Sequence, residues 1–143
     1  MGDVMREVEL KRVHMGGVEY GEDLLKSITS FVSERKILSG LIMLLGGLRK
    51  TSLAYYDQNE KVFRKISCDE PVEIVSCYGN ISMKDGEPHV HLHLIGSKGD
   101  GSCIGGHVIE GCEVFAAEFF IFEFSGKVER KYDERTGLYL WDL

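Results

Sequence analysis

Residues 88–94, PHVHLHL, alternate between histidine and an aliphatic side chain from His89 onward. Successive side chains of a β-strand point to opposite faces of a sheet. His89, His91 and His93 would therefore share one face, and the aliphatic residues between them would point the other way, into a core. Such strict alternation is typical of a half-buried strand. This stretch therefore predicts a sheet with an apolar face and a face that carries imidazole rings.

The rest of the chain predicts an α+β domain around this strand. Residues 22–36 carry apolar side chains at helical spacing, with acidic residues in the first turn and Arg35 and Lys36 in the last. Hairpin-length turns join most of the remaining segments, which favours antiparallel pairing. We predict a single domain over residues 1–143, a mostly antiparallel, twisted sheet of about seven or eight strands with one main amphipathic helix. The expected strands are 6–14, 41–45, 48–56, 62–66, 71–81, 88–96, 102–111 and 113–124, with 137–143 as a candidate edge strand.

A third histidine follows the alternating stretch across a glycine-rich turn. Residues 97–102, SKGDGS, predict a hairpin centred near Asp100, so the numbers of paired residues should sum to about 200. His107 then lies opposite His93, with the two Cβ atoms about 4.5–5.5 Å apart. Zinc binds imidazole nitrogen at about 2.0–2.1 Å and takes at least three protein ligands. We therefore predict a metal site, by default zinc, formed by His91, His93 and His107.

Other interpretations of these residues stay open. The alternation also suits a solvated sheet face or histidines at a subunit contact, and a slip of one residue would turn His107 away from the others. His89 is either a fourth ligand or a hydrogen-bonding partner of the other rings, and the isolated His14 is expected at the surface. Gly105 and Gly106 predict a bulge that re-aims His107, a close backbone approach, or a flexible strand start.

Charge and composition restrict the classes of function. The formal net charge is −6, and lysine and arginine form no basic run longer than an adjacent pair such as Arg49-Lys50, whereas direct DNA binding usually needs a basic patch. The longest apolar run is too short to span a membrane, and the charged N-terminal residues do not suit a signal peptide, so we expect a cytoplasmic location. The cysteines are expected to be reduced and mainly buried, with a metal ligand as the less favoured alternative. They are Cys68, Cys77, Cys103 and Cys112.

An enzymatic role is an open alternative. Catalytic zinc commonly has three protein ligands and an open position for water, and a nearby carboxylate would act as the base. Glu73, Glu110 and Glu118 are the candidate carboxylates. Glu73 is either exposed on the polar face of the sheet or orients a histidine, and Glu118 is either a charged residue on the outer face or a partner held at an interface. P-loop, dinucleotide-binding and GxSxG motifs are absent. The sequence therefore favours a binding module over an enzyme.

Several segments together resemble the PPC (plants and prokaryotes conserved) domain, which follows AT-hooks in plant nuclear proteins. They include EPVEIVSCYGNIS, DGEPHVHLHL and GGHVIEGCEVFAAEFFIFEF, and the resemblance covers nearly the whole chain. It implies a compact α+β domain that assembles as a homotrimer, with His107 near His91 and His93, and with His89 as an addition to the usual pattern. Prokaryotic members are often described as predicted DNA-binding proteins, and plant members bind AT-rich DNA through the AT-hook.

This sequence has no RGRP-type AT-hook and no basic arm, which argues against direct DNA binding. We therefore predict a cytoplasmic, metal-binding, PPC-like homotrimer that acts as a regulatory or interaction module and reaches DNA through a partner. The alternative is a metal-dependent enzyme that acts on a small molecule at a subunit boundary.

Overall fold

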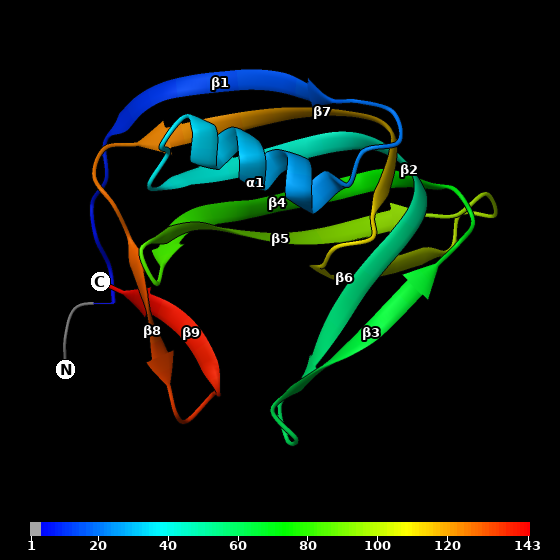
Figure 1. Ribbon diagram of the computed structural model, residues 1–143. Coiled ribbons are helices and arrows are strands. Elements are labelled where there is room, and N and C mark those ends of the chain that lie inside the picture. The colour runs from blue at the N-terminus through cyan, green and yellow to red at the C-terminus, as the bar shows by residue number, and fades with distance from the viewer. Residues whose placement is uncertain (1–3) are drawn as a thin grey trace.

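The computed structural model describes residues 4–143, which form one small domain with a single helix and nine strands (Figure 1). All strand pairs are antiparallel except β4 with β8. The predicted α+β class, the one main helix and the mostly antiparallel sheet are confirmed. The elements are β1 (Leu10–Val18), α1 (Leu24–Glu34), β2 (Gly40–Asp57), β3 (Val62–Cys68), β4 (Val72–Lys84), β5 (Glu87–Ser97), β6 (Cys103–Val108), β7 (Glu113–Phe124), β8 (Glu129–Asp133) and β9 (Leu138–Asp142).

The predicted count of seven or eight strands is wrong, and two regions explain the difference. Residues 41–45 and 48–56, expected as two strands, form the continuous strand β2, which passes an irregularity between Leu44 and Gly46. The C-terminal residues form a hairpin, β8–β9, instead of one edge strand, because Gly137 adopts a positive φ of 73° and donates to the carbonyl of Asp133. β1 also begins later than predicted and continues past Gly16.

Helix α1 is shorter than the predicted 22–36. Asp23 is its N-cap, and its carboxylate accepts hydrogen bonds from the backbone N–H of Lys26 at 3.0 Å and of Gly111 at 2.6 Å. The acidic and basic residues expected in the terminal turns lie just outside the helix, since Arg35 already is the C-cap. With 11 residues, α1 cannot cross a membrane, and residues 4–143 contain no helix that could.

The core lies between α1 and one face of the sheet (Figure 1). Leu24, Ile28 and Val32 of the helix are fully buried, and each buried side chain of this size contributes about 1.5–3 kcal/mol of hydrophobic free energy. Residues 90, 92 and 94 of β5 are buried as predicted. The histidines of β5 therefore occupy the face opposite the helix.

Strand β2 organises the sheet because it has partners along its whole length. Its first half pairs with β7 on one side and β4 on the other, and its second half pairs with β3 and briefly with β6. Because β4, β5 and β6 are also neighbours, the four strands β2, β4, β5 and β6 close on themselves. The β2–β3 ribbon and the β8–β9 hairpin extend beyond this unit and face each other across a gap in the ribbon trace (Figure 1).

Glu123 of β7 is a buried carboxylate held by three basic side chains of β1. His14 Nε2 lies 2.8 Å from its Oε2, and Lys11 and Arg12 each lie 3.5 Å from its oxygens. Burial opposes the charge of Glu123, but the His14 hydrogen bond and the two cations outweigh it and lower its pKa. His14, expected at the surface, is half-buried by this contact and packs edge-on against Phe31.

We expect Glu123→Gln to lower the free energy of unfolding at pH 7 by about 1–2 kcal/mol, because the cations lose their partner. A carboxyl group whose pKa is lower in the folded than in the unfolded protein stabilises the fold at pH values above its ordinary pKa of 4.5. This stabilisation is lost as the pH falls from 4.5 through the pKa of the folded protein. The difference between variant and wild type should therefore shrink below about pH 4.5. Urea unfolding at one fixed protein concentration measures it, with the exposed Glu7→Gln as the control. A difference that stays constant down to pH 3 would contradict this assignment.

Candidate metal centre

Two neighbouring strands position the three predicted histidines. His91 and His93 lie two residues apart on β5, and His107 lies on β6 directly across from His93. Paired residue numbers sum to 200 through the whole β5–β6 pairing, as in Ile95 with Gly105, so the predicted register is confirmed. All three rings therefore lie on the same face of the sheet.

The three rings converge closely enough to share one ion. Nε2 of His91 lies 3.2 Å from Nε2 of His93, and the three ring centroids are 4.8–5.8 Å apart. One nitrogen from each ring lies within 4.8 Å of the others. Two nitrogens bound tetrahedrally at about 2.0–2.1 Å from zinc would be about 3.3 Å apart. The spacing of His91 and His93 already matches this value, and a nitrogen of His107 lies within 4.8 Å of both.

The surroundings of His91 and His107 favour the neutral form of these two rings, which is the form that binds a metal. Burial, together with the charges of His107 and His93, lowers the pKa of His91 to about 3. Burial, followed by the charge of His93 and then Arg130, also lowers the pKa of His107. His89 has its pKa lowered to about 4 by burial and by Arg130 and Lys84. It shares the histidine face but does not belong to the group whose nitrogens converge.

Two glycines allow the histidine strands to lie close to their neighbours. A Cβ at Gly106 would lie 2.8 Å from the carbonyl oxygen of Ala54 on β2, and one at Gly79 would lie 1.7 Å from that of His91. Of the predicted roles for the glycines before His107, close backbone approach is therefore the one observed at Gly106. No register shift interrupts the β5–β6 pairing, so the predicted alternative of a bulge is wrong.

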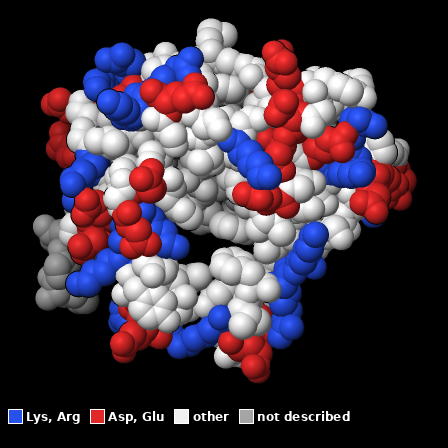
Figure 2. Space-filling model, viewed as in Figure 1, with Lys and Arg blue, Asp and Glu red and all other residues white. Residues whose placement is uncertain are grey.

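The histidine face forms the floor of a cleft of about 550 Å³. The β2–β3 ribbon supplies one wall, where the ring of Phe63 packs 5.1 Å from that of His107. The β8–β9 hairpin supplies the opposite wall. The two walls meet at one end, where the hydroxyl of Tyr56 donates to the carbonyl of Thr136 at 2.6 Å. Lys61 adds a second link by donating to the carbonyl of Glu134 at 2.9 Å. Figure 2 shows the surface hollowed between these parts.

Most of the cleft lining was not identified from the sequence, including its residues Phe63, Lys84, Arg130 and Tyr139. They come from β3, the end of β4, β8 and β9. Alternation along 62–66 indicates which side chains of β3 share a face, but no local pattern shows that this face turns toward the histidines. In the sequence, the turn-forming residues 133–137 were the sign that the C-terminal residues form a hairpin.

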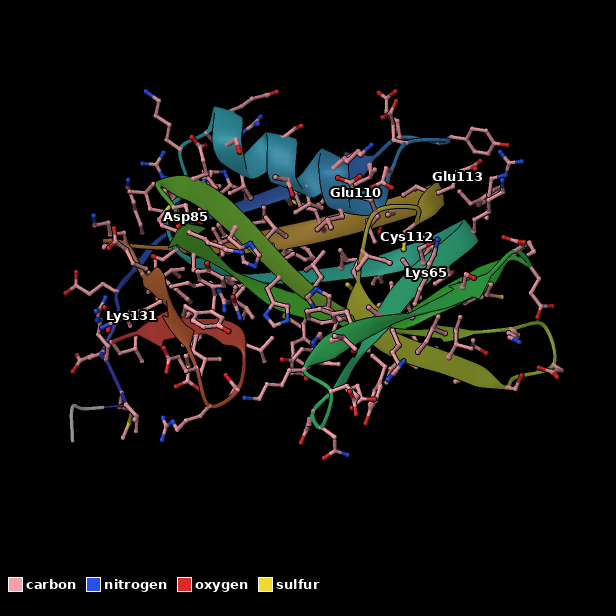
Figure 3. All side chains as sticks on the ribbon, turned by 60° about the horizontal axis from the view of Figure 1, so that its bottom comes forward. Lys65, Asp85, Glu110, Cys112, Glu113 and Lys131 are labelled. Atoms are coloured by element: carbon pink, nitrogen blue, oxygen red, sulfur yellow. The ribbon has the colours of Figure 1, made fainter. Side chains whose placement is uncertain are left out.

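The structure does not bring the three candidate carboxylates to the histidines. Glu73 and Glu118 are exposed, and Glu110 is exposed beside α1, where it lies 3.5 Å from Lys26 (Figure 3). No acidic residue of the described chain lines the cleft. Among the cysteines, Cys77 and Cys112 are buried as expected, and burial raises their pKa values to about 12 and 11. Cys68 is half-buried, Cys103 is exposed, and the converging group includes no cysteine.

The surface also lacks a basic stripe on the face shown in Figure 2, where lysine and arginine are interspersed with acidic side chains. Arg49, one residue of the basic pair Arg49-Lys50, lies 2.6 Å from the carboxylate of Glu113. Its charge is therefore largely compensated within the chain, and this cluster is a weak candidate for a phosphate-binding surface.

Comparison with known proteins gives a family and several similar structures. The profile described as the Plants and Prokaryotes Conserved (PCC) domain matches residues 5–125. A metal-containing protein from Archaeoglobus fulgidus is 40% identical, with a TM-score of 0.91 over 96% of this chain and 97% of the other. A plant- and prokaryote-conserved (PPC) protein from Pyrococcus horikoshii is 36% identical, with a TM-score of 0.92 over 99% and 98% of the two chains.

Two further similarities are weaker in sequence. A proposed DNA-binding protein from Bacteroides thetaiotaomicron is 25% identical, with a TM-score of 0.87 over 94% of this chain and 96% of the other. The bifunctional protein GlmU from Synechococcus sp. (strain JA-3-3Ab) is 29% identical over 124 residues, which is 82% of this chain. The chain spans only 18% of that relative's length.

Gly106→Ala should weaken binding of the predicted zinc ion about tenfold or more without removing a ligand. The added methyl group would press on the carbonyl oxygen of Ala54 and displace β6 and the ring of His107, and displaced ligand supports commonly reduce metal affinity about 10–100-fold. Competition with a chelating dye measures the affinity. Gly99→Ala is the matched control, because a Cβ there has open space around it. Equal zinc affinity in Gly106→Ala and wild type would show that β2 and β6 separate without moving the site.

Proposed function

Because the chain belongs to the Plants and Prokaryotes Conserved domain family, we propose that it is a zinc-binding domain that acts as a homotrimeric regulatory or interaction module. The convergence of His91, His93 and His107 carries the proposal. The similar protein from Archaeoglobus fulgidus is a metal-containing protein, which supports a metal here. Three neutral nitrogen ligands suit zinc better than magnesium or calcium, which take oxygen ligands.

The homotrimer is supported by an exposed apolar surface on the sheet. Cross-strand pairing puts Met15, Phe120, Met43 and Tyr78 in one row that continues to His93. We use the term sheet-face patch for these exposed residues and their neighbours, namely Val13, Met15, Met43, Leu45, Tyr78 and Phe120. Contiguous apolar surface of this kind is uncommon on monomers and typical of protein contacts. Covering it with further copies of the chain would bury it beside the metal centre.

An association with DNA through a partner fits this chain better than direct binding. The similar protein from Bacteroides thetaiotaomicron is a proposed DNA-binding protein, which gives DNA association some support. However, this chain carries a formal charge of −6, and Arg49 is already paired with Glu113. Direct phosphate binding needs several uncompensated cations on one surface.

A metal-dependent enzyme remains the second candidate, because the cleft opens directly onto the histidine face. A bound zinc ion would supply Lewis acidity there. The described lining provides no carboxylate to accept a proton, so a hydrolytic mechanism would need a base from elsewhere, such as another subunit. Binding is therefore the better-supported role for this cleft.

His91→Ala and His107→Ala should each reduce bound zinc to well below one ion per chain, because zinc would keep only two of its three nitrogen ligands. Elemental analysis of the purified protein measures zinc per chain. His89→Ala is the matched control, because His89 lies on the same strand face but outside the converging group, so it should retain zinc. Full zinc content in both His91→Ala and His107→Ala would rule out this ligand set.

Met43→Lys should break the proposed trimer at micromolar concentration. It places a charge in the middle of the sheet-face patch, where association would have to bury it without a partner. Sedimentation equilibrium gives the mass of the wild type and the variant. Leu38→Lys, which changes an exposed leucine next to the helix, should leave the mass unchanged. A wild-type protein that sediments as a monomer at micromolar concentration would refute the trimer.

A further inference from the structure

The cleft beside the histidines carries positive charge without a compensating acid. Its charged lining residues are Lys84 and Arg130, and no aspartate or glutamate of the described chain contributes to the lining. Both cations are half-buried, and neither forms an ion pair with a carboxylate of the described chain. Charges that are removed from water are normally paired. In a chain with a formal charge of −6, this local excess of positive charge points to an anionic ligand.

Within residues 4–143, the hydrogen-bonding partners of the Arg130 side chain are all neutral groups. Its Nε donates to Ser82 Oγ at 2.6 Å, one terminal nitrogen donates to Asn80 Oδ1 at 2.8 Å, and the other donates to the carbonyl of Tyr139 at 2.8 Å. These three bonds fix the plane of the guanidinium. A guanidinium has five N–H donors, so two of them have no hydrogen-bonding partner in residues 4–143. A rigid donor group with unused N–H bonds is suited to binding a carboxylate or a phosphate.

The same contacts place Arg130 beside the histidines. Asn80 pairs with His91 across β4 and β5, and Ser82 pairs with His89, so the two acceptors lie on the histidine face. Lys84 lies farther along the same face of β4, with its ammonium group 4.0 Å from the centre of the Tyr139 ring. The positive groups are therefore gathered where β8–β9 meets the floor of the cleft.

The remaining surface of the cleft suits the organic part of a ligand. Phe63 and Tyr56 line one wall, and Leu138 and Leu140 belong to the other. The volume of about 550 Å³ falls in the usual range for sites that bind small molecules, about 300–1,000 Å³. A positively charged end and apolar walls together favour a ligand that has an anionic group attached to a hydrophobic or aromatic body.

We propose that the cleft binds a small organic oxyanion, a carboxylate or a phosphate compound, whose anionic group is held by Arg130 with help from Lys84. The Arg130 contact stands without the metal. A zinc ion on three neutral imidazoles would add two positive charges to the same cleft, and this additional contribution rests on the proposed function. The ligand class follows from the chemistry of the lining: fixed N–H donors, two cations, no acid and aromatic walls.

Phenylphosphonate is a suitable test ligand because it joins an oxyanion to an aromatic ring and resists hydrolysis. Isothermal titration calorimetry of the wild type should show binding to the metal-free protein and tighter binding to the zinc-loaded protein. Arg130→Gln should weaken binding to both forms about tenfold or more, since a hydrogen bond to a charged group contributes about 1.5–3 kcal/mol. Lys131→Gln is the control, because it removes the same charge from an exposed neighbouring position on β8 (Figure 3) and should leave binding unchanged.

Lys84→Gln provides a second variant if Arg130→Gln fails to fold. Within residues 4–143 the Lys84 side chain forms no hydrogen bond or ion pair and lies over the Tyr139 ring, so its replacement should leave the fold intact and weaken phenylphosphonate binding about threefold or more.

Several outcomes would overturn the proposal. The first is that neither metal-free nor zinc-loaded wild type binds phenylphosphonate at millimolar concentration. The second is that Arg130→Gln and Lys131→Gln weaken binding equally. The third is that binding requires zinc and does not depend on Arg130 or Lys84. The last result would leave the zinc proposal standing. Conversely, a wild-type protein that cannot be loaded with zinc but still binds phenylphosphonate through Arg130 would refute the zinc proposal alone.

Discussion

The antiparallel register between β5 and β6 is the constraint on which the rest of the site depends. Each pair in this ladder places two side chains on the same face, and His93 with His107 is one such pair. A shift of one residue would move His107 to the helix side and bring Val108 out to solvent. The apolar face under α1 makes that shift costly, because Val108, Leu92 and Leu94 are all fully buried. Packing of the core and alignment of the histidines are thus fixed by the same hydrogen-bonded ladder.

The closed arrangement of β2, β4, β5 and β6 explains how one small domain supports both a core and a cleft. Each of these strands has a neighbour on both sides, so the histidine floor is not a free sheet edge. The outer parts of the two-stranded extensions, residues 55–63 of β2–β3 and 129–142 of β8–β9, then rise from this floor and lie outside the hydrophobic core. Tyr56 and Lys61 join them at one end through hydrogen bonds to backbone carbonyls. The rigid part of the molecule therefore holds the rings, and the extensions shape the space above them.

The sequence was informative where the structure is governed by short-range rules. The period of two along β5 and the short turn around Asp100 were enough to pair His93 with His107, and helical spacing located α1. It was uninformative where distant segments meet. Arg130 reaches the cleft because β8 pairs with β4 about 50 residues away along the chain, and nothing near Arg130 encodes that pairing. Gly46 misled the prediction of β2, because a glycine that usually ends a strand here allows it to continue through an irregularity with a positive φ of 144°.

The two walls of the cleft end in surface turns, residues 58–61 and 134–137, that lie outside the hydrophobic core. Surface turns of this kind accept insertions and deletions far more readily than core strands do. Relatives could therefore lengthen or shorten either wall and admit ligands of different size, while keeping the three imidazoles and the packing under the helix unchanged. In this architecture, relatives that bind different ligands would differ mainly in the lengths of these two hairpins.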